Sequence, residues 1–328
     1  MTAFIITVLC LLFVLVLLLV AFGVLILVSI VNFDKGEDLP TDEVAYKEPF
    51  KNNDIFQNDF DGLLPQTVIH KTVMEHFKNE NGLDKKAVII GWDGARADAM
   101  IKIANEDGGI KTLRDNGGKS YLLYTGNETG KKILQDTSTA PGWATVLTGE
   151  WATKSLVFSN YTPKFFKDTF LKSLAEEGQK TSFNYLWTYH SFTYALEKYV
   201  LKEKDQTFNF IKNKDNSDLV TMENRLKDAV IADIDNDKDV IFSIFESPDT
   251  IGHMNEFSPN NEKYMIGMRN INGYAKEIIE HIYSRDTYGK EDWLIIIVPD
   301  HGGILSNHGS QTIECRTIFA VSNKVLAS

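Results

Sequence analysis

The stretch LIIIVPDHGG, residues 294–303, indicates how this chain folds. Its first five residues are aliphatic and uncharged, a run typical of a strand buried on both faces of a parallel sheet. Asp300 and His301 follow directly, and the two glycines after them allow the irregular backbone on which neighbouring side chains can converge. A buried strand that ends in a carboxylate and an imidazole therefore predicts both a sheet and a candidate site at its carboxyl edge.

Two other apolar runs end in the same way. AVIIGW, residues 87–92, leads into Asp93, and VIFSIF, residues 240–245, leads into Asp249. Further strand-like runs lie at 182–187 and 317–321, and apolar residues recur at helical spacing in 164–177, 219–234 and 262–283. We therefore expect an α/β fold, a three-layer α/β/α sandwich with a mostly parallel central sheet. The three aspartates would meet at the carboxyl ends of its strands.

Histidines accompany two of these aspartates. His253 lies four residues after Asp249, so a helical turn would place both side chains on one face. His308 follows His301 by seven residues, a separation that a loop closes easily. Carboxylate and imidazole ligands together suit zinc and related divalent ions rather than calcium. With Asp93 and Asp300 there are enough ligands for two divalent metal ions, for which we expect Zn²⁺. Two such ions can hold the attacking and leaving oxygens of a displacement at phosphorus.

A nucleophile for such a displacement is present in STAPGWATVLTG, residues 138–149. Thr139 precedes a run of small residues that predicts a helix. Free backbone N–H groups at a helix start favour an anionic oxygen, but a threonine hydroxyl needs a metal ion to lower its pKa. A threonine at this position also suits a simple helix cap, so its assignment as nucleophile depends on the other motifs.

In their order along the chain, these motifs resemble the alkaline phosphatase superfamily, and most closely its type I phosphodiesterase and nucleotide pyrophosphatase branch. The resembling blocks are GWDGAR (91–96), TAPGWATVLTG (139–149), SPDTIGH (247–253) and DHGG with the later HG (300–303, 308–309). They extend over most of the chain after residue 86. The joint order of the blocks, more than any one of them, makes the resemblance specific.

The resemblance implies a role for each of these residues. One metal ion would be held by Asp93, Asp300 and His301 together with the Thr139 hydroxyl, and the other by Asp249, His253 and His308. Asn160, eleven residues after Gly149, would help hold a phosphoryl oxygen. Thr139 would attack phosphorus to give a covalent phospho-threonine, which water then hydrolyses. Around the nucleophile the chain departs from the branch, because Ala140 and Gly142-Trp143 stand where an aromatic residue and an asparagine are common.

Phosphate esters, and phosphodiesters above all, are the expected substrates. A phosphonate hydrolase, a phosphoethanolamine-type transferase and a phosphomonoesterase of the same superfamily stay open. So does a protein of another class, an anchored binding module without catalysis. Four aromatic side chains are candidates for stacking on a base or an aromatic leaving group, namely Trp143, Tyr161, Trp187 and Tyr189.

The N-terminal residues differ in character from the rest. Residues 3–31 are almost wholly apolar and uncharged, a run long enough to span a bilayer core of roughly 30 Å. We expect a transmembrane anchor at 1–33, an acidic stalk and lead-in at 34–85 with a helix near 68–78, and a catalytic domain at 86–328. The anchor would be a single-pass helix, with the catalytic domain outside the cytoplasm.

The net charge of −11 opposes binding to a phosphate backbone, so nucleic acid is not expected as a main partner. Cys10 lies in the apolar N-terminal run and Cys315 near the other end of the sequence, so we expect no disulfide framework. The expected partners are a phosphate-ester substrate and, through the N-terminal helix, a membrane. The sequence leaves the oligomeric state open.

Overall fold

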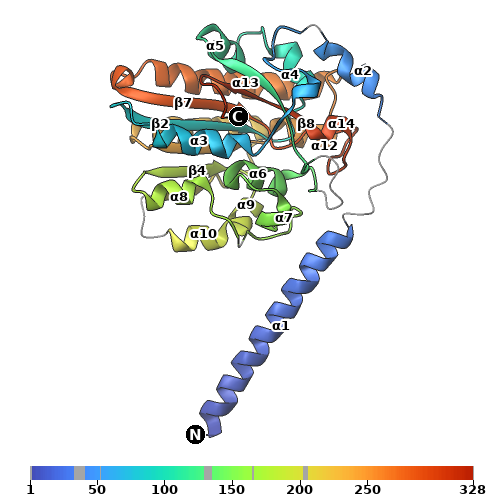
Figure 1. The fold of residues 1–328 in the computed structure, drawn as a ribbon, viewed down its shortest axis with the longest axis vertical. Coiled ribbons are helices and arrows are strands. Elements are labelled where there is room, and N and C mark those ends of the chain that lie inside the picture. The colour runs from blue at the N-terminus through green and yellow to red at the C-terminus, as the bar shows by residue number, and fades with distance from the viewer. Residues whose placement is uncertain are drawn as a thin grey trace.

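The computed structural model describes residues 2–32, 41–51, 53–128, 135–164, 166–201 and 206–327, and within the first range it describes the side chains of residues 10–25 only. In these ranges an eight-stranded sheet forms the centre of an α/β body (Figure 1). The strands lie in the order β1-β3-β8-β7-β2-β6-β4-β5. Neighbouring strands are parallel except where β8 pairs with β3 and β7. The predicted α/β fold with a mostly parallel sheet is therefore confirmed.

The strands and helices alternate along most of the chain. The strands are β1 (Leu64–Pro65), β2 (Asp84–Trp92), β3 (Lys119–Tyr124), β4 (Thr181–Tyr185), β5 (Gln206–Phe210), β6 (Val240–Phe245), β7 (Glu291–Val298) and β8 (Thr317–Ser322). The longer helices are α1 (Thr2–Asn32), α3 (Val68–Lys78), α6 (Thr139–Thr148), α11 (Leu219–Asp235), α12 (Ser247–Met254) and α13 (Glu262–Tyr283). The shorter ones are α2 (Glu43–Lys47), α4 (Ala97–Ile103), α5 (Gly109–Asp115), α7 (Ala152–Ser155), α8 (Phe170–Glu176), α9 (Tyr189–Thr193), α10 (Ala195–Val200) and α14 (Ile313–Arg316).

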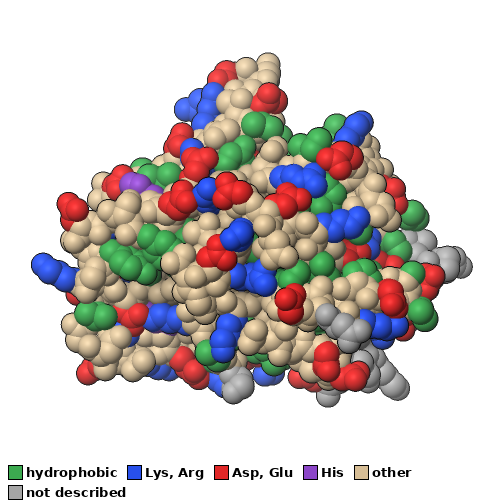
Figure 2. Space-filling view, turned by 90° about the horizontal axis from the view of Figure 1, so that it is seen from above, with side chains coloured by type: hydrophobic (Ala, Val, Ile, Leu, Met, Phe, Trp, Pro, Cys, Tyr) green, Lys and Arg blue, Asp and Glu red, His purple; other side chains and the backbone are tan. Residues whose placement is uncertain are grey.

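Helices cover both faces of the sheet, and each face has its own hydrophobic core. Successive side chains of a strand point to opposite faces, so Val88 and Ile90 of β2 join one core while Ala87 and Ile89 join the other. The first core also takes side chains from α4, α5, α11 and α13, and the second from α3, α6 and α8. The face seen in Figure 2, from the top of Figure 1, carries acidic and basic side chains interspersed, as a solvated surface does.

Elements with a long and regular apolar pattern were predicted best. The apolar run at 240–245 matches β6, and the helical pattern at 262–283 matches α13. Strand β5 was not predicted, because its sequence QTFNF is half polar and it lies at the edge of the sheet, where its residues are only partly buried. The helix expected from residue 164 begins only at Phe170, because the Thr169 hydroxyl caps it by accepting the Lys172 N–H at 3.1 Å.

Residues 41–85, expected as a stalk and lead-in, pack against the sheet. Ile69 of α3 is fully buried in the second core, and Ile55 is buried in the first. Strand β1 pairs with β3, and the buried Gln66 donates from Nε2 to the Asp300 carbonyl oxygen at 2.8 Å. The described part of this segment therefore belongs to the body, and the packing has no break at residue 86. Residues 34–40 of the predicted stalk lie outside the described residues.

Helix α1 is continuous from Thr2 to Asn32. Where the structure describes side chains, no helix is long and apolar enough to cross a membrane. The span predicted for residues 3–31 lies partly outside those residues, since only the side chains of 10–25 are described. Within that stretch Leu11, Phe13 and Leu18 are 65%, 64% and 62% exposed, so they are not packed in a protein core.

The burial of Ile69 gives a test of whether α3 is part of the body. Truncating this fully buried side chain in Ile69→Ala removes apolar contacts and leaves a cavity, which we expect to lower the free energy of unfolding by about 2–5 kcal/mol. Glu75→Ala, on the same helix but 57% exposed, is the control and should change it by less than about 0.5 kcal/mol. Urea unfolding followed by tryptophan fluorescence measures both. Equal effects would contradict the packing of α3 against the sheet.

Candidate metal centre and active site

The candidate site forms where the three central strands end. β7, β2 and β6 are adjacent and parallel, so their carboxyl ends meet at one edge of the sheet. Asp300 and His301 follow β7, Asp93 follows β2, and α12 begins two residues after β6. Asp249 and His253 both lie on α12, one helical turn apart. The sheet thus brings together residues that are more than 200 positions apart in the sequence.

Asp93, Asp300 and His301 form one group of possible metal ligands, and all three side chains are buried. His301 Nε2 lies 3.5 Å from Asp93 Oδ1 and 3.3 Å from Asp300 Oδ2. Nδ1 of the same ring is 2.7 Å from the Gly302 carbonyl oxygen, which fixes the ring and leaves Nε2 to face the two carboxylates. A second hydrogen bond of this kind is usual for a histidine that binds a metal.

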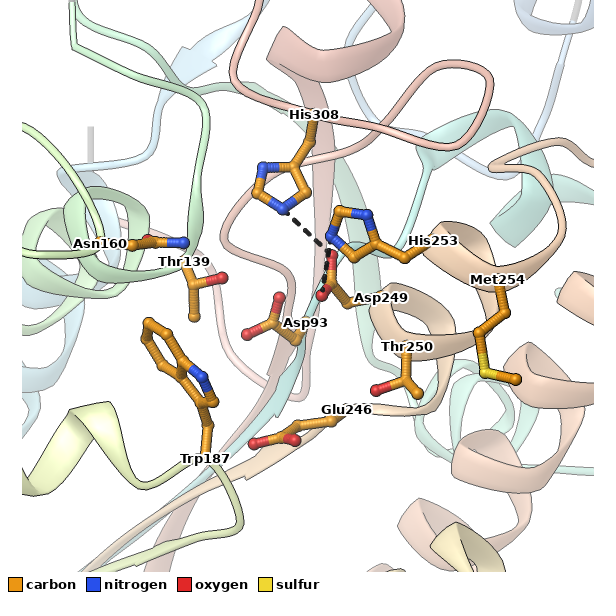
Figure 3. Close-up of a pocket in the computed structure, with 10 residues that line it drawn as sticks. All are labelled: Asp93, Thr139, Asn160, Trp187, Glu246, Asp249, Thr250, His253, Met254 and His308. Carbon is orange, nitrogen blue, oxygen red and sulfur yellow. Dashed lines mark ion pairs between the residues drawn. The ribbon is translucent and has the colours of Figure 1, made fainter.

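Asp249, His253 and His308 form the second group. Asp249 lies between the two imidazoles, with Oδ2 3.5 Å from His253 Nε2 and Oδ1 3.6 Å from His308 Nε2, as the dashed lines in Figure 3 mark. His253 Nδ1 contacts the Ser306 carbonyl oxygen at 3.0 Å, so its Nε2 also remains directed at the site. In each group the possible ligand atoms lie within 4.8 Å of one another.

The two groups are neighbours and influence each other. The ring centroids of His301 and His308 are 4.1 Å apart. Burial, followed by the charge of Asp249, raises the pKa of Asp93 well above its usual value, and hydrogen bonds from Trp143 and Thr139 act in the opposite direction. Burial, with the charges of Asp93 and Asp249, likewise raises the pKa of Asp300. Three carboxyl groups placed this closely repel one another when ionised, and divalent cations would relieve that repulsion.

The donor atoms fit such cations. Asp300 Oδ2, His301 Nε2 and Asp249 Oδ1 are buried and have no hydrogen-bond partner, a state that is costly unless a ligand satisfies them. Burial lowers the pKa of His301, and it lowers that of His308 to about 3, so both imidazoles are neutral at neutral pH, the form that binds metal. The first group offers two carboxylates and one imidazole, and the second offers one carboxylate and two imidazoles. Both combinations match the ligand preference of zinc.

Two glycines allow the close packing around these ligands. Gly94 has φ = +67°, and a Cβ there would lie 2.8 Å from Cα and Cβ of Asp249, so only glycine lets β2 and α12 approach this closely. The Gly94 N–H donates to Asp300 Oδ1 at 3.2 Å. A Cβ on Gly142 of α6 would lie 2.8 Å from Cβ of Asp300. The helix that begins at Thr139 therefore packs directly against the end of β7.

Thr139 is the first residue of α6, and Asn160 lies beside it. The Asn160 Oδ1 atom accepts the Ala140 N–H at 2.8 Å, and this leaves its Nδ2 group free to donate into the site. Pro141 has no N–H, and Gly142 donates to the Ser138 carbonyl oxygen. Of the N–H groups at the helix start, that of Ala140 is therefore occupied and Pro141 has none, so the Asn160 amide is an additional donor for an anionic oxygen.

Thr139 and Asn160 line one cavity of about 380 Å³ together with Asp93 of the first metal-ligand group and all three residues of the second (Figure 3). Its lining comprises Asp93, Thr139, Asn160, Trp187, Glu246, Asp249, Thr250, His253, Met254 and His308. Asp300 and His301 lie behind this lining. The structure therefore brings all of the sequence-predicted ligand and catalytic residues to a single place.

Three residues near the site have roles that the sequence interpretation missed. Trp143, a stacking candidate, is fully buried in the second core, and its Nε1 donates to Asp93 Oδ2 at 3.0 Å, so it orients a ligand instead. Arg96 pairs with Asp98 at 2.7 Å and donates to the carbonyl oxygens of Phe257 and Gly303, which supports the loop that carries His308. Glu246 lines the cavity directly after β6, a strand-end position that could have been noticed.

A family model for the type I phosphodiesterase / nucleotide pyrophosphatase matches residues 87–326. The chain belongs to this family. The family is part of the alkaline phosphatase superfamily, which confirms the resemblance found in the sequence. The two Asp/His groups agree with the metal dependence of the superfamily. No curated protein matches the chain.

Several solved structures are similar in fold at low identity. Phosphonoacetate hydrolase from Sinorhizobium meliloti 1021 is 12% identical, with 67% of this chain and 57% of that chain covered and a TM-score of 0.49. Murine ectonucleotide pyrophosphatase / phosphodiesterase 5 is 15% identical, with 66% and 57% covered and a TM-score of 0.48. Alkaline phosphatase from the Antarctic bacterium TAB5 is 12% identical, with 74% and 92% covered and a TM-score of 0.44. The chain spans less than two thirds of the length of the first two.

The pKa of Asp249 predicts how metal binding depends on pH. Burial raises this pKa to about 7, whereas His308 is already neutral, so a cation that binds to the second group must displace the Asp249 proton below pH 7. We expect the zinc affinity of this group to fall about tenfold per pH unit below 7 and to level off above it. Asp300→Asn, which removes a ligand of the first group, isolates the second group for titration against a competing chelator. An affinity that is constant from pH 5.5 to 7 would contradict this.

Proposed function

We propose that the chain is a membrane-anchored, two-metal hydrolase that cleaves phosphodiesters, with Thr139 as the nucleophile. The observation that carries the proposal is the shared cavity, which Thr139 lines together with Asp93 of the first group of metal ligands and the whole second group. Family membership supports the class of reaction. A helix cap alone would explain Thr139 but not its position among three carboxylates and three imidazoles.

Two cations, for which zinc is the best fit to the donor atoms, would be held by Asp93, Asp300 and His301 and by Asp249, His253 and His308. When bound, they supply positive charge that lowers the pKa of the Thr139 hydroxyl and neutralises phosphoryl oxygens. The Thr139 hydroxyl gives its proton to solvent and Oγ1 attacks phosphorus; the bond from phosphorus to the leaving oxygen breaks, and that oxygen takes a proton from solvent to leave as the alcohol. Water then attacks phosphorus, the bond to Oγ1 breaks, the phosphate monoester leaves and Thr139 regains its proton.

The chain's own residues hold the reacting groups in place. The Trp143 indole and the Gly94 amide orient Asp93 and Asp300 through hydrogen bonds of 3.0 and 3.2 Å. The Asn160 amide, fixed by the Ala140 N–H, donates to a phosphoryl oxygen on which negative charge increases during attack. Because these donors are positioned before the substrate arrives, little reorganisation is needed in the transition state.

The charge of the cavity supports a diester as the substrate. None of the residues that line it in the described part of the chain is a lysine or arginine, whereas Glu246 adds a further carboxyl group. A phosphate monoester carries one more negative charge than a diester, and in this cavity no cationic side chain faces that charge. A diester, with one charge to neutralise, is therefore the better match.

The membrane anchor is part of the same proposal. Residues 2–32 form one helix of 31 residues without a charged side chain, and most of the apolar side chains described within it are exposed. A helix of about 20 apolar residues spans a bilayer core, so this length suffices with some tilt. We place the catalytic domain outside the cytoplasm.

A non-catalytic binding module is the less favoured function. Such a module would be expected to have lost a ligand or the nucleophile, but each of those positions is filled and the ligands are gathered in two groups. Transfer of the phosphoryl group to another alcohol instead of water would use the same residues, and product analysis with and without an added alcohol separates the two reactions.

Removing the nucleophile tests the mechanism. Thr139→Ala should lower turnover of an aryl phosphodiester at least about a thousandfold, because the attacking oxygen is gone, with both metal ions retained. Ser138→Ala removes the neighbouring buried hydroxyl, which does not line the cavity, and should stay within a few fold of the parent. Rates are read from release of the chromogenic alcohol and metal content from elemental analysis. Parental turnover in Thr139→Ala would refute the assignment.

Asn160 is tested separately. Asn160→Ala should lower kcat about a hundredfold with a smaller change in KM, because its amide stabilises charge that appears in the transition state. Asn160→Asp keeps the acceptor for the Ala140 N–H but loses the donor, and we expect it to be no better than the alanine variant. An unchanged kcat in Asn160→Asp would mean that Asn160 only fixes the start of α6.

A further inference from the structure

Helices α9 and α10 form a nearly continuous helical segment beside the cavity. The backbone bonds from Tyr194 N–H to the His190 carbonyl oxygen and from Lys198 N–H to the Tyr194 carbonyl oxygen, each 3.0 Å, run through the junction of the two helices. One side of the segment faces the body. There His190, Tyr194, Glu197 and Leu201, spaced at three or four residues, are buried, and Tyr194 joins the second core.

The opposite side of the same segment is also apolar, although it faces outward. Phe192, Leu196, Tyr199 and Val200 are 49%, 45%, 76% and 52% exposed, and they recur at the spacing that places them on one helical face. A surface helix normally carries polar residues on its outer side. Exposed apolar side chains gathered on one face indicate an interaction surface. We call these four residues the α9–α10 face.

The α9–α10 face continues to the rim of the cavity. Trp187, which lines the cavity, stacks on Tyr189 at the start of α9, with ring centroids 5.0 Å apart and planes at 28°. Tyr189 meets the 68% exposed Tyr161 edge to face at 5.8 Å. Met254, another lining residue, is 77% exposed. A partner that binds to the α9–α10 face would therefore lie beside the opening of the cavity.

We propose that the α9–α10 face lies in the headgroup region of the bilayer that α1 enters, so that the cavity opens at the lipid surface and takes lipid headgroup phosphodiesters as substrates. The inference rests on the proposed anchor and catalytic function. Tyrosine, tryptophan and phenylalanine beside leucine are the residues that proteins place at a membrane interface. The chain from Asn32 to Thr41 reaches about 30 Å at most, which keeps the body close to the membrane.

A fluorescent label on the face measures its contact with lipid. The full chain, with Cys10→Ser so that the fully buried Cys315 is the remaining native thiol, carries Leu196→Cys with an environment-sensitive nitrobenzoxadiazole label. The matched control is Ile266→Cys on α13. Ile266 is 48% exposed, as Leu196 is 45% exposed, but α13 covers the opposite face of the sheet. Both are reconstituted in phosphatidylcholine vesicles that contain nitroxide-labelled lipid.

We expect the Leu196 label to be quenched by the nitroxide lipid severalfold more than the Ile266 label. Equal quenching of the two would overturn the proposal. So would a Leu196 label that is shielded from aqueous iodide yet unquenched by lipid, since a second copy or another protein would then cover the face. Retention of the chain in vesicles after an alkaline wash tests the anchor separately. Hydrolysis of a soluble aryl phosphodiester tests the catalytic function separately, so failure of either is distinguishable from failure of the docking.

Discussion

Mutual repulsion among three carboxyl groups is the constraint on which the rest of this structure depends. Asp93, Asp249 and Asp300 follow adjacent parallel strands, so the sheet forces them together at its carboxyl edge. Buried carboxylates without counter-charges are strongly unfavourable, and no lysine or arginine lines the described part of the cavity to neutralise them. The fold therefore concentrates negative charge at one place, and small divalent cations neutralise it better than a side chain could.

The residues around the site keep the three aspartates close together without a positively charged side chain to pair with them. Gly94 and Gly142 let backbone and helix approach the aspartates closely, and Trp143 fixes Asp93 from the core side. Arg96 does not neutralise the ligands, because it is fully engaged with Asp98 and with two carbonyl oxygens of the adjoining loops. This guanidinium is thus used to hold the loop backbone, and the carboxylates stay available for metal ions.

Much of this could be predicted from the sequence, for a physical reason. Strands β2, β6 and β7 are continuous apolar runs because both faces are buried, and the polar residue that ends each run marks the edge where ligands bind. The four-residue spacing of Asp249 and His253 predicted that both side chains lie on one face of a helical turn. What could not be predicted depends on tertiary contacts. The role of Trp143 follows from a hydrogen bond across 50 residues, and the packing of residues 41–85 follows from scattered apolar side chains in a segment whose composition is acidic.

The position of Gln66 has a structural consequence. Its side chain is fully buried and hydrogen-bonds the carbonyl oxygens of Pro299 and Asp300, the residues that join β7 to the metal ligands. Gln66 is also near the end of the segment that leads from α1 into the body, where β1 pairs with β3. One amide group therefore joins the segment before α3 to the backbone that carries Asp300, and replacing Gln66 by an apolar side chain would leave both carbonyl oxygens without this donor.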